Sequence, residues 1–121
     1  MNLAVDKEAI TKKGILYVLR ISIEGKELVK VGVTCRDKIE DRVCEILVSI
    51  WKKYRIFPEL YVKRYRTVDN VYGNETKLHK ELEEYRYKTL HRFSGSTEVF
   101  DVSLDLVVEA YERLLDEAVS T

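Results

Sequence analysis

Two apolar, β-branched segments separated by a short turn constrain the fold of this chain more than any other feature. Residues 15–23 pass from an apolar run into alternating apolar and polar side chains, as in a half-buried strand, and residues 28–34 form a second such run. Residues 24–26 lie between them and contain a glycine, which is typical of a hairpin turn. The sequence therefore predicts an antiparallel hairpin in which Tyr17 and Lys30 are neighbours.

A helix is predicted after the hairpin, over residues 38–54. Its apolar residues recur every three or four positions, which is the pattern of one buried helical stripe. Asp37 and Glu40 are placed as a capping box at its start, and Arg42 borders the stripe near the beginning of the helix. The apolar positions are Ile39, Val43, Ile46, Ile50 and Tyr54.

A second helix is predicted in the middle of the chain. Asp69 or Asn70 can cap it, and helical spacing of apolar residues continues to about Tyr87. Glu75 and His79 are four positions apart, so they share one face of this helix.

The remaining segments complete an α+β fold. Residues 60–68 are rich in aromatic and β-branched residues and predict a third strand. Residues 98–102 form a short extended run, and residues 103–119 form an apolar-striped final helix. The order β-β-α-β-α plus a C-terminal helix predicts a small three-stranded antiparallel sheet flanked by helices. With 121 residues, the chain (1–121) is expected to be a single domain.

Charge, hydropathy and cysteine spacing exclude several classes of protein. Lys plus Arg and Asp plus Glu number 21 each, so any attraction to nucleic acid must be local. No apolar run approaches the ~20 residues that span a bilayer, and the N-terminus has no signal core. No membrane partner is therefore expected, and the expected location is the cytoplasm. Cys35 and Cys44 lack zinc-site spacing and are interpreted as packing thiols.

A local concentration of basic residues lies on the third strand and the segment before it. Such a patch can hold phosphates despite zero net charge, although a solvated surface is an equally good interpretation. Strand alternation places Tyr61 and Tyr65 on one face, and Val62 and Arg64 on the other. The candidate DNA-binding residues are Lys52, Lys53, Arg55, Lys63, Arg64 and Arg66.

Several polar residues suit the hydrolysis of a phosphodiester. This reaction needs an activated water, stabilised phosphate charge and help for the leaving oxygen. Tyr17 is the candidate base or water-orienting group, because a cation such as Lys30 or Arg42 would favour an ionised hydroxyl. Arg42 offers a planar charged fork for a phosphate. Glu75 is a hard oxygen ligand suited to Mg²⁺.

Each of these residues also has a simpler interpretation. A tyrosine in a strand usually packs, and Lys30 alone would decorate a solvated edge. Arg42 has an acidic neighbour, so a surface ion pair is the default. Glu75 and His79 form a common surface pair on a helix.

The order and spacing of five short motifs together resemble the GIY-YIG nuclease superfamily, and most of all its small phage-borne branch. The resemblance covers about residues 14–102. The motifs are Gly14-Ile15-Leu16-Tyr17, Lys30-Val31-Gly32-Val33-Thr34, Asp41-Arg42-Val43, Asn74-Glu75-Thr76-Lys77-Leu78-His79 and Thr97-Glu98-Val99-Phe100.

This resemblance implies a three-stranded antiparallel sheet with flanking helices and cleavage of DNA with one divalent ion, Mg²⁺ or Mn²⁺, held by a single glutamate. By position, Tyr17 corresponds to the base or nucleophile activator. Arg42 corresponds to the helix arginine that contacts the scissile phosphate, and Glu75 to the metal ligand. His79 matches the histidine one turn after that glutamate.

Two departures from the superfamily pattern affect the predicted site. Lys30 stands where the second tyrosine of the name is expected, and it would bind phosphate or favour ionisation of Tyr17. Gly32 and Thr34 adjoin it as candidate supporting residues. The late asparagine of many members is not evident, and the loop ending at Glu98 occupies the comparable stretch. Glu98 either orients the site or has a purely structural role.

The leading hypothesis is thus a metal-dependent DNA endonuclease with Tyr17, Lys30, Arg42, Glu75 and His79 in its site. One rival is a DNA-binding module of the same fold without turnover. A second rival is a protein-interaction domain that docks through its C-terminal helix. Cutting both strands of a duplex with one such site would call for a homodimer, and the sequence leaves this open.

Overall fold

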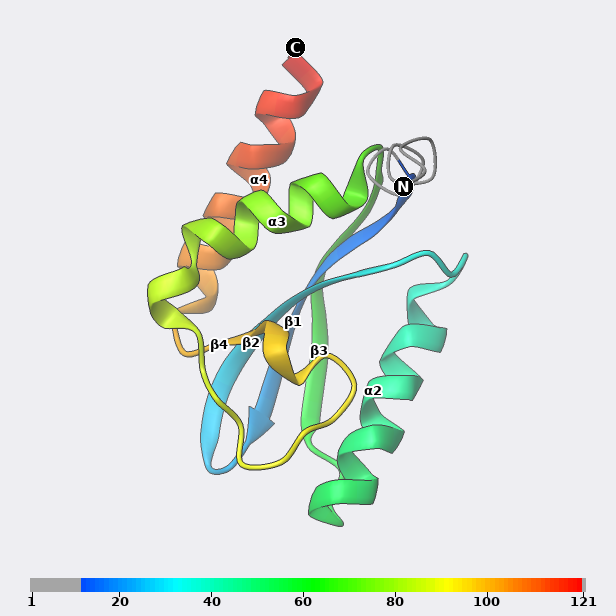
Figure 1. The fold of residues 1–121 in the computed structure, drawn as a ribbon, viewed down its shortest axis with the longest axis vertical. Helices are drawn as coiled ribbons and strands as arrows, with labels where there is room; N and C mark the ends of the chain where they lie inside the picture. The colour runs from blue at the N-terminus through cyan, green and yellow to red at the C-terminus, as the bar shows by residue number, and fades with distance from the viewer. Residues whose placement is uncertain (1–11, 121) are drawn as a thin grey trace, which may run out of the picture.

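The predicted hairpin is the centre of the computed structural model, which describes residues 12–120 (Figure 1). Strand β1 covers Gly14–Ile23 and pairs antiparallel with β2, Lys26–Thr34. At the turn, Glu24 has φ 55° and Gly25 has φ 72°. Positive φ at two central turn residues suits the right-handed twist of a tight hairpin.

The hairpin belongs to a four-stranded antiparallel sheet with the order β3-β1-β2-β4. Strand β3 covers Glu59–Val68, and β4 covers only Val99–Phe100. The α+β class and the three predicted strands are confirmed, but the strand count is corrected from three to four. A two-residue strand pairs too briefly to leave a pattern in the sequence, although it lies inside the predicted extended run.

The pairing of β3 with β1 shifts by one residue at Lys63, which forms a β-bulge. The extra residue reverses the alternation of faces along β3. Tyr65 lies opposite Tyr17, whereas Tyr61 lies opposite Arg20, and these two β1 positions point to different faces of the sheet. The prediction that Tyr61 and Tyr65 share a face is therefore wrong.

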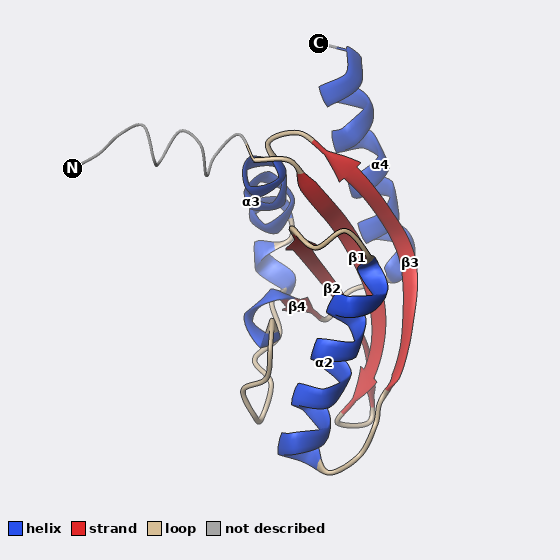
Figure 2. Cartoon of the chain, turned by 90° about the vertical axis from the view of Figure 1, so that its right-hand side faces the viewer, coloured by secondary structure: helices blue, strands red, loops and turns tan. Residues whose placement is uncertain are grey.

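Helices cover both faces of the sheet (Figure 2). Helix α2, Ile39–Tyr54, packs on one face, and α4, Leu104–Ser120, packs on the other together with the apolar stripe of α3, Val71–Glu81. The α2 core includes Leu19, Ile21, Ile39, Ile46 and Ile50, and the α4 core includes Leu16, Val18, Leu78, Val107 and Tyr111. Burial of both cores is the main favourable contribution to folding.

Two predicted helix ends need correction. The N-cap of α2 is Lys38 in extended conformation with no side-chain cap, so the capping box of Asp37 and Glu40 does not form. Helix α3 ends at Glu81 and is followed by a 3₁₀ turn at Glu83–Tyr85, short of the predicted end near residue 87. The chain leaves the helix because its backbone there pairs with β4, where the Tyr87 amide donates to the Val99 carbonyl at 2.8 Å.

The cysteine prediction is also wrong. Cys35 and Cys44 are both free and exposed, so neither packs in the core. Cys44 lies on α2 but outside its buried stripe.

Among the described residues, no helix combines the length and apolar character needed to cross a membrane.

The carboxylate of Glu24 ties the hairpin turn to two distant segments. It accepts hydrogen bonds from the Tyr54 hydroxyl at 2.5 Å, the Tyr87 hydroxyl at 2.7 Å and the Leu90 amide at 2.8 Å. Burial tends to raise the pKa of Glu24, but these hydrogen bonds outweigh it and hold the pKa below its ordinary value. The turn, the end of α2 and the segment after α3 are thus joined through one side chain.

We expect Glu24→Gln to lower the free energy of unfolding at pH 7 by about 1–2 kcal/mol, because an amide cannot accept three hydrogen bonds. The pKa of Glu24 in the folded protein lies below its value of about 4.3 in the unfolded chain. The stability advantage of wild type over Glu24→Gln is therefore fully present above that pH. It is lost as the pH falls through the folded pKa. Urea denaturation at pH 7 and pH 3 measures this difference. The exposed control Glu84→Gln should change little at either pH, and a pH-independent cost of Glu24→Gln would contradict the argument.

Candidate functional site

The Tyr17 hydroxyl lies at the centre of the candidate site. Lys30 Nζ donates to its oxygen at 3.4 Å and Arg42 Nε donates at 3.2 Å. Tyr17 and Lys30 come from neighbouring strands of the hairpin, and Arg42 comes from the first turn of α2. The predicted neighbourhood of these three residues is therefore present, with two cations directed at one hydroxyl oxygen.

Gly32 leaves the space that this arrangement needs. It lies opposite Tyr17 in the β1–β2 ladder. A Cβ at this position would lie 2.5 Å from the Tyr17 hydroxyl oxygen and 2.9 Å from Lys30 Nζ. Any other residue would push these groups apart. Thr34 has a local role, since its Oγ1 accepts a hydrogen bond from the Arg36 amide at 3.2 Å.

Lys30 is fully buried, with a side-chain exposure of 0%. Its ammonium bonds Glu98 Oε1 at 2.6 Å in addition to Tyr17. Because the ammonium is shielded from solvent and already paired, it is not placed to bind a phosphate directly. The second predicted role, an influence on Tyr17, fits this burial better.

Arg42 is positioned by groups that sequence reasoning missed. Its Nη1 donates to Ser94 Oγ at 2.7 Å and to Glu45 Oε1 at 3.0 Å. Burial tends to lower the pKa of Arg42, but hydrogen bonds to Tyr17 and Glu45 raise it above its ordinary value. Gly95 follows in the left-handed region at φ 79°, and a Cβ there would collide with the end of Lys30. In the sequence, only the Ser-Gly-Ser pattern around Gly95 indicated a loop here.

Glu75, His79 and Glu98 form a second group beside these cations. One potential ligand atom from each lies within 4.8 Å of the others. Glu75 and His79 come from α3, as predicted, and Glu98 comes from the 3₁₀ turn Ser96–Glu98 just before β4. Glu98 contacts Lys30 and lies beside the α3 pair, which fits the first of its two predicted roles, orienting the site; that role stays a prediction.

The two carboxyl groups have different electrostatic environments. Burial, a hydrogen bond with Glu98 and the charge of Glu98 raise the pKa of Glu75 to about 8. Burial also tends to raise the pKa of Glu98, but the Lys30 ammonium and a hydrogen bond from Glu75 bring it below its ordinary value. Burial and the neighbouring carboxyl group thus favour a neutral Glu75, whereas the Lys30 ammonium favours an ionised Glu98.

His79 has a defined orientation. Its Nε2 lies 2.7 Å from the Val31 carbonyl oxygen, which can only accept, so Nε2 carries the proton and Nδ1 keeps a free lone pair. Burial lowers the pKa of His79, which favours the neutral ring. Strand β4 pairs only with Val29 and Lys30, so the next residue of β2 is available for this contact with α3.

The predicted basic patch does not gather at this site. Lys52 and Lys53 lie in the last turn of α2, far along the helix from Arg42, and Arg55 caps its end. Lys63, Arg64 and Arg66 lie on β3, the sheet edge opposite β4. Arg64 is paired with Glu112 of α4 at 2.8 Å. The role of these six residues in DNA binding stays a prediction.

Comparison with known families identifies the family of this chain. Residues 14–115 match the family model described as the T5orf172 domain, and the chain belongs to this family. The family indicates a phage-type module that is nuclease-like or DNA-binding. No curated protein and no solved structure matched the chain.

Proposed function

We propose that this protein is a metal-dependent endonuclease of the GIY-YIG type that hydrolyses phosphodiester bonds in DNA. The observation that carries the proposal is the convergence of Tyr17, with two cations on its hydroxyl, and the Glu75–His79–Glu98 group. Membership of the T5orf172 domain family supports it independently. The order of the sequence motifs supports the GIY-YIG assignment.

The residues present fit a divalent cation. Glu75 Oε2 is buried and has no hydrogen-bond partner among the described residues, which is costly unless a ligand satisfies it. Glu98 lies nearby, so the two carboxyl groups offer hard oxygen donors suited to Mg²⁺ or Mn²⁺, while His79 Nε2, 3.9 Å from Glu75 Oε2, is engaged with the Val31 carbonyl. A cation bound there would supply Lewis-acid stabilisation of negative charge on the phosphate and the leaving oxygen.

The protein side chains have separate roles in this proposal. Tyr17 accepts two hydrogen bonds from cations, which use both lone pairs of its neutral hydroxyl, so its proton is left to donate to the attacking water and orient it. Arg42 is held by Ser94 and Glu45 and offers a guanidinium edge to the scissile phosphate. Lys30 acts as a positioning residue, because it reaches Tyr17 and Glu98 but not the solvent. His79 orients the group through its contact with β2.

A plasmid assay tests this function directly. We expect purified protein to convert supercoiled plasmid to nicked or linear DNA in Mg²⁺ or Mn²⁺, and not in EDTA. Nicking alone would favour a monomer acting on one strand at a time, whereas linear product at the earliest times would favour a homodimer. A folded protein that shifts DNA in a gel but cuts it with neither metal would instead be the inactive binding module. Absence of both activities would favour a protein-interaction domain.

A further inference from the structure

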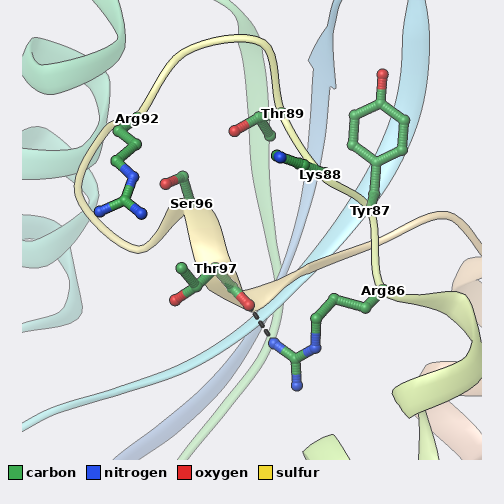
Figure 3. Close-up of a pocket in the computed structure, with 7 residues that line it drawn as sticks. All are labelled: Arg86, Tyr87, Lys88, Thr89, Arg92, Ser96 and Thr97. Atoms are coloured by element: carbon green, nitrogen blue, oxygen red, sulfur yellow. Dashed lines mark hydrogen bonds between the residues drawn. The ribbon is translucent and has the colours of Figure 1, made fainter.

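A pocket of about 370 Å³ lies beside the candidate site, within the segment that connects α3 to β4. This volume falls in the lower part of the range for small-molecule sites, about 300–1,000 Å³. Figure 3 shows Arg92 on one side of the loop and Arg86 on the other, with Ser96 and Thr97 between them. Tyr87, Lys88 and Thr89 complete the lining.

The charge of the lining is entirely positive. Arg86 is part of the wall, because its guanidinium bonds the Thr97 carbonyl and Glu83 and lies over the Phe100 ring. Lys88 and Arg92 are exposed, and neither has a carboxylate partner in the part of the chain that the structure describes. Two cations are thus free to meet an anion at this pocket.

The inner surface of the pocket is mainly apolar, although its rim is charged. Long stems of arginine and lysine can provide such a surface while their charged ends remain in water. The Tyr87 side chain is fixed because its hydroxyl donates to Glu24. A ligand that fits must therefore combine a compact, weakly polar part with a negative charge.

The pocket shares a wall with the candidate site. Ser96 and Thr97 line the pocket and immediately precede Glu98, which pairs with Lys30. On the other side of the same loop, Ser94 bonds Arg42 and Gly95 packs against Lys30. A group bound in the pocket is thus separated from the site by one turn of backbone.

We propose that this pocket binds one nucleotide of the DNA strand next to the bond that is cut, with its phosphate on Lys88 and Arg92 and its base against the apolar interior. The position along the strand rests on the proposed nuclease function. The chemistry of the ligand rests on the pocket alone: a base has a weakly polar face for the interior, and a phosphate suits two unpaired cations. Free nucleotide and nucleotide within a strand share this chemistry.

Two-dimensional ¹H–¹⁵N NMR of the full chain in EDTA tests the location of binding. We expect thymidine 5′-monophosphate to shift the backbone amides of residues 86–97 more than those of β3 or the end of α2. Inorganic phosphate should shift the same amides but bind with a Kd at least about fivefold higher, since it lacks the base. Equal effects of phosphate and nucleotide would overturn the base contact, and shifts confined to other surfaces would overturn the pocket.

Charge-removing variants test whether a DNA strand uses the pocket. In EDTA, Lys88→Gln and Arg92→Gln should each weaken binding of a fluorescent single-stranded oligonucleotide about three- to tenfold. Each lost phosphate contact should also reduce the slope of log K against log salt concentration by about 0.7. The matched control Lys77→Gln removes an exposed charge on the face of α3 opposite Glu75 and should change binding less than twofold. Equal losses in all three variants, or none, would contradict the proposal.

These measurements separate this inference from the proposed function. Binding at residues 86–97 by a protein that cuts no DNA would support the pocket and reject the nuclease. If Arg92→Gln and Lys88→Gln change neither the rate of cleavage nor the affinity for the oligonucleotide, the result would support the nuclease and reject the pocket.

Discussion

Glu75→Gln should lower the rate of metal-dependent plasmid cleavage by at least about 100-fold. Glutamine keeps the size of the side chain but removes the anionic oxygen that the proposed Mg²⁺ or Mn²⁺ needs. Glu98 and His79 cannot replace it, because the charge of Glu98 is shared with Lys30 and His79 Nε2 is engaged with the Val31 carbonyl. The loss should therefore be in turnover, measured as initial nicking rate at saturating metal.

The fold should survive this change. Burial and Glu98 raise the pKa of Glu75 to about 8, so without metal its side chain is largely neutral at pH 7, as glutamine is. We expect the free energy of unfolding in EDTA to stay within about 1 kcal/mol of wild type. Glu109→Gln, an exposed change on α4, is the matched control for activity. Undiminished cleavage by a folded Glu75→Gln protein would reject the assigned metal ligand.

Lys30→Met should destabilise the protein by about 3 kcal/mol or more, because it leaves Glu98 next to a second carboxyl group without its buried counter-charge. For a domain of this size, such a loss corresponds to a decrease in Tm of about 12 °C or more. Thermal unfolding in EDTA measures it. The volume of the side chain is nearly conserved, so a packing defect contributes little.

A second substitution separates charge from packing. In Lys30→Met/Glu98→Gln the unpaired carboxylate is also removed, and at least half of the lost stability should return. Lys26→Met makes the same change on the same strand, where the exposed lysine pairs with Asp101 at 3.2 Å and lies over the Tyr87 ring, and it should cost at most about 1 kcal/mol. A double variant no more stable than Lys30→Met would show that the ion pair is not the cause.

Local patterns were sufficient to predict most of the fold. Alternation and turn chemistry predicted the hairpin, and helical spacing predicted α2 and α4 to within about two residues. The errors have non-local causes. Helix α3 ends early because the following backbone pairs with β4, and the faces of β3 exchange because of the bulge at Lys63. In both cases the pairing strand, β4 or β1, is distant in the sequence.

The candidate site was predictable where it depends on the hairpin and on helix faces. Tyr17 and Lys30 meet across one ladder, and Glu75 and His79 share a helical turn. Apart from Glu45, which lies on α2 three residues after Arg42, the parts that were missed belong to one irregular loop. Ser94, Gly95 and the pairing of Glu98 with Lys30 follow from contacts to distant strands and helices, and a loop sequence carries no periodicity from which such contacts can be read.

The contacts of Glu24 and Lys30 with distant segments also determine when the candidate site can form during protein synthesis. Glu24 lies 66 residues before Leu90, and Lys30 lies 68 residues before Glu98. The hairpin itself needs only local closure, whereas these contacts close long loops and pay more chain entropy. A nascent chain on the ribosome can therefore form the hairpin early, but it has no complete site until Glu98 has emerged. Incomplete chains would carry Tyr17 and Lys30 without the other groups of the candidate site.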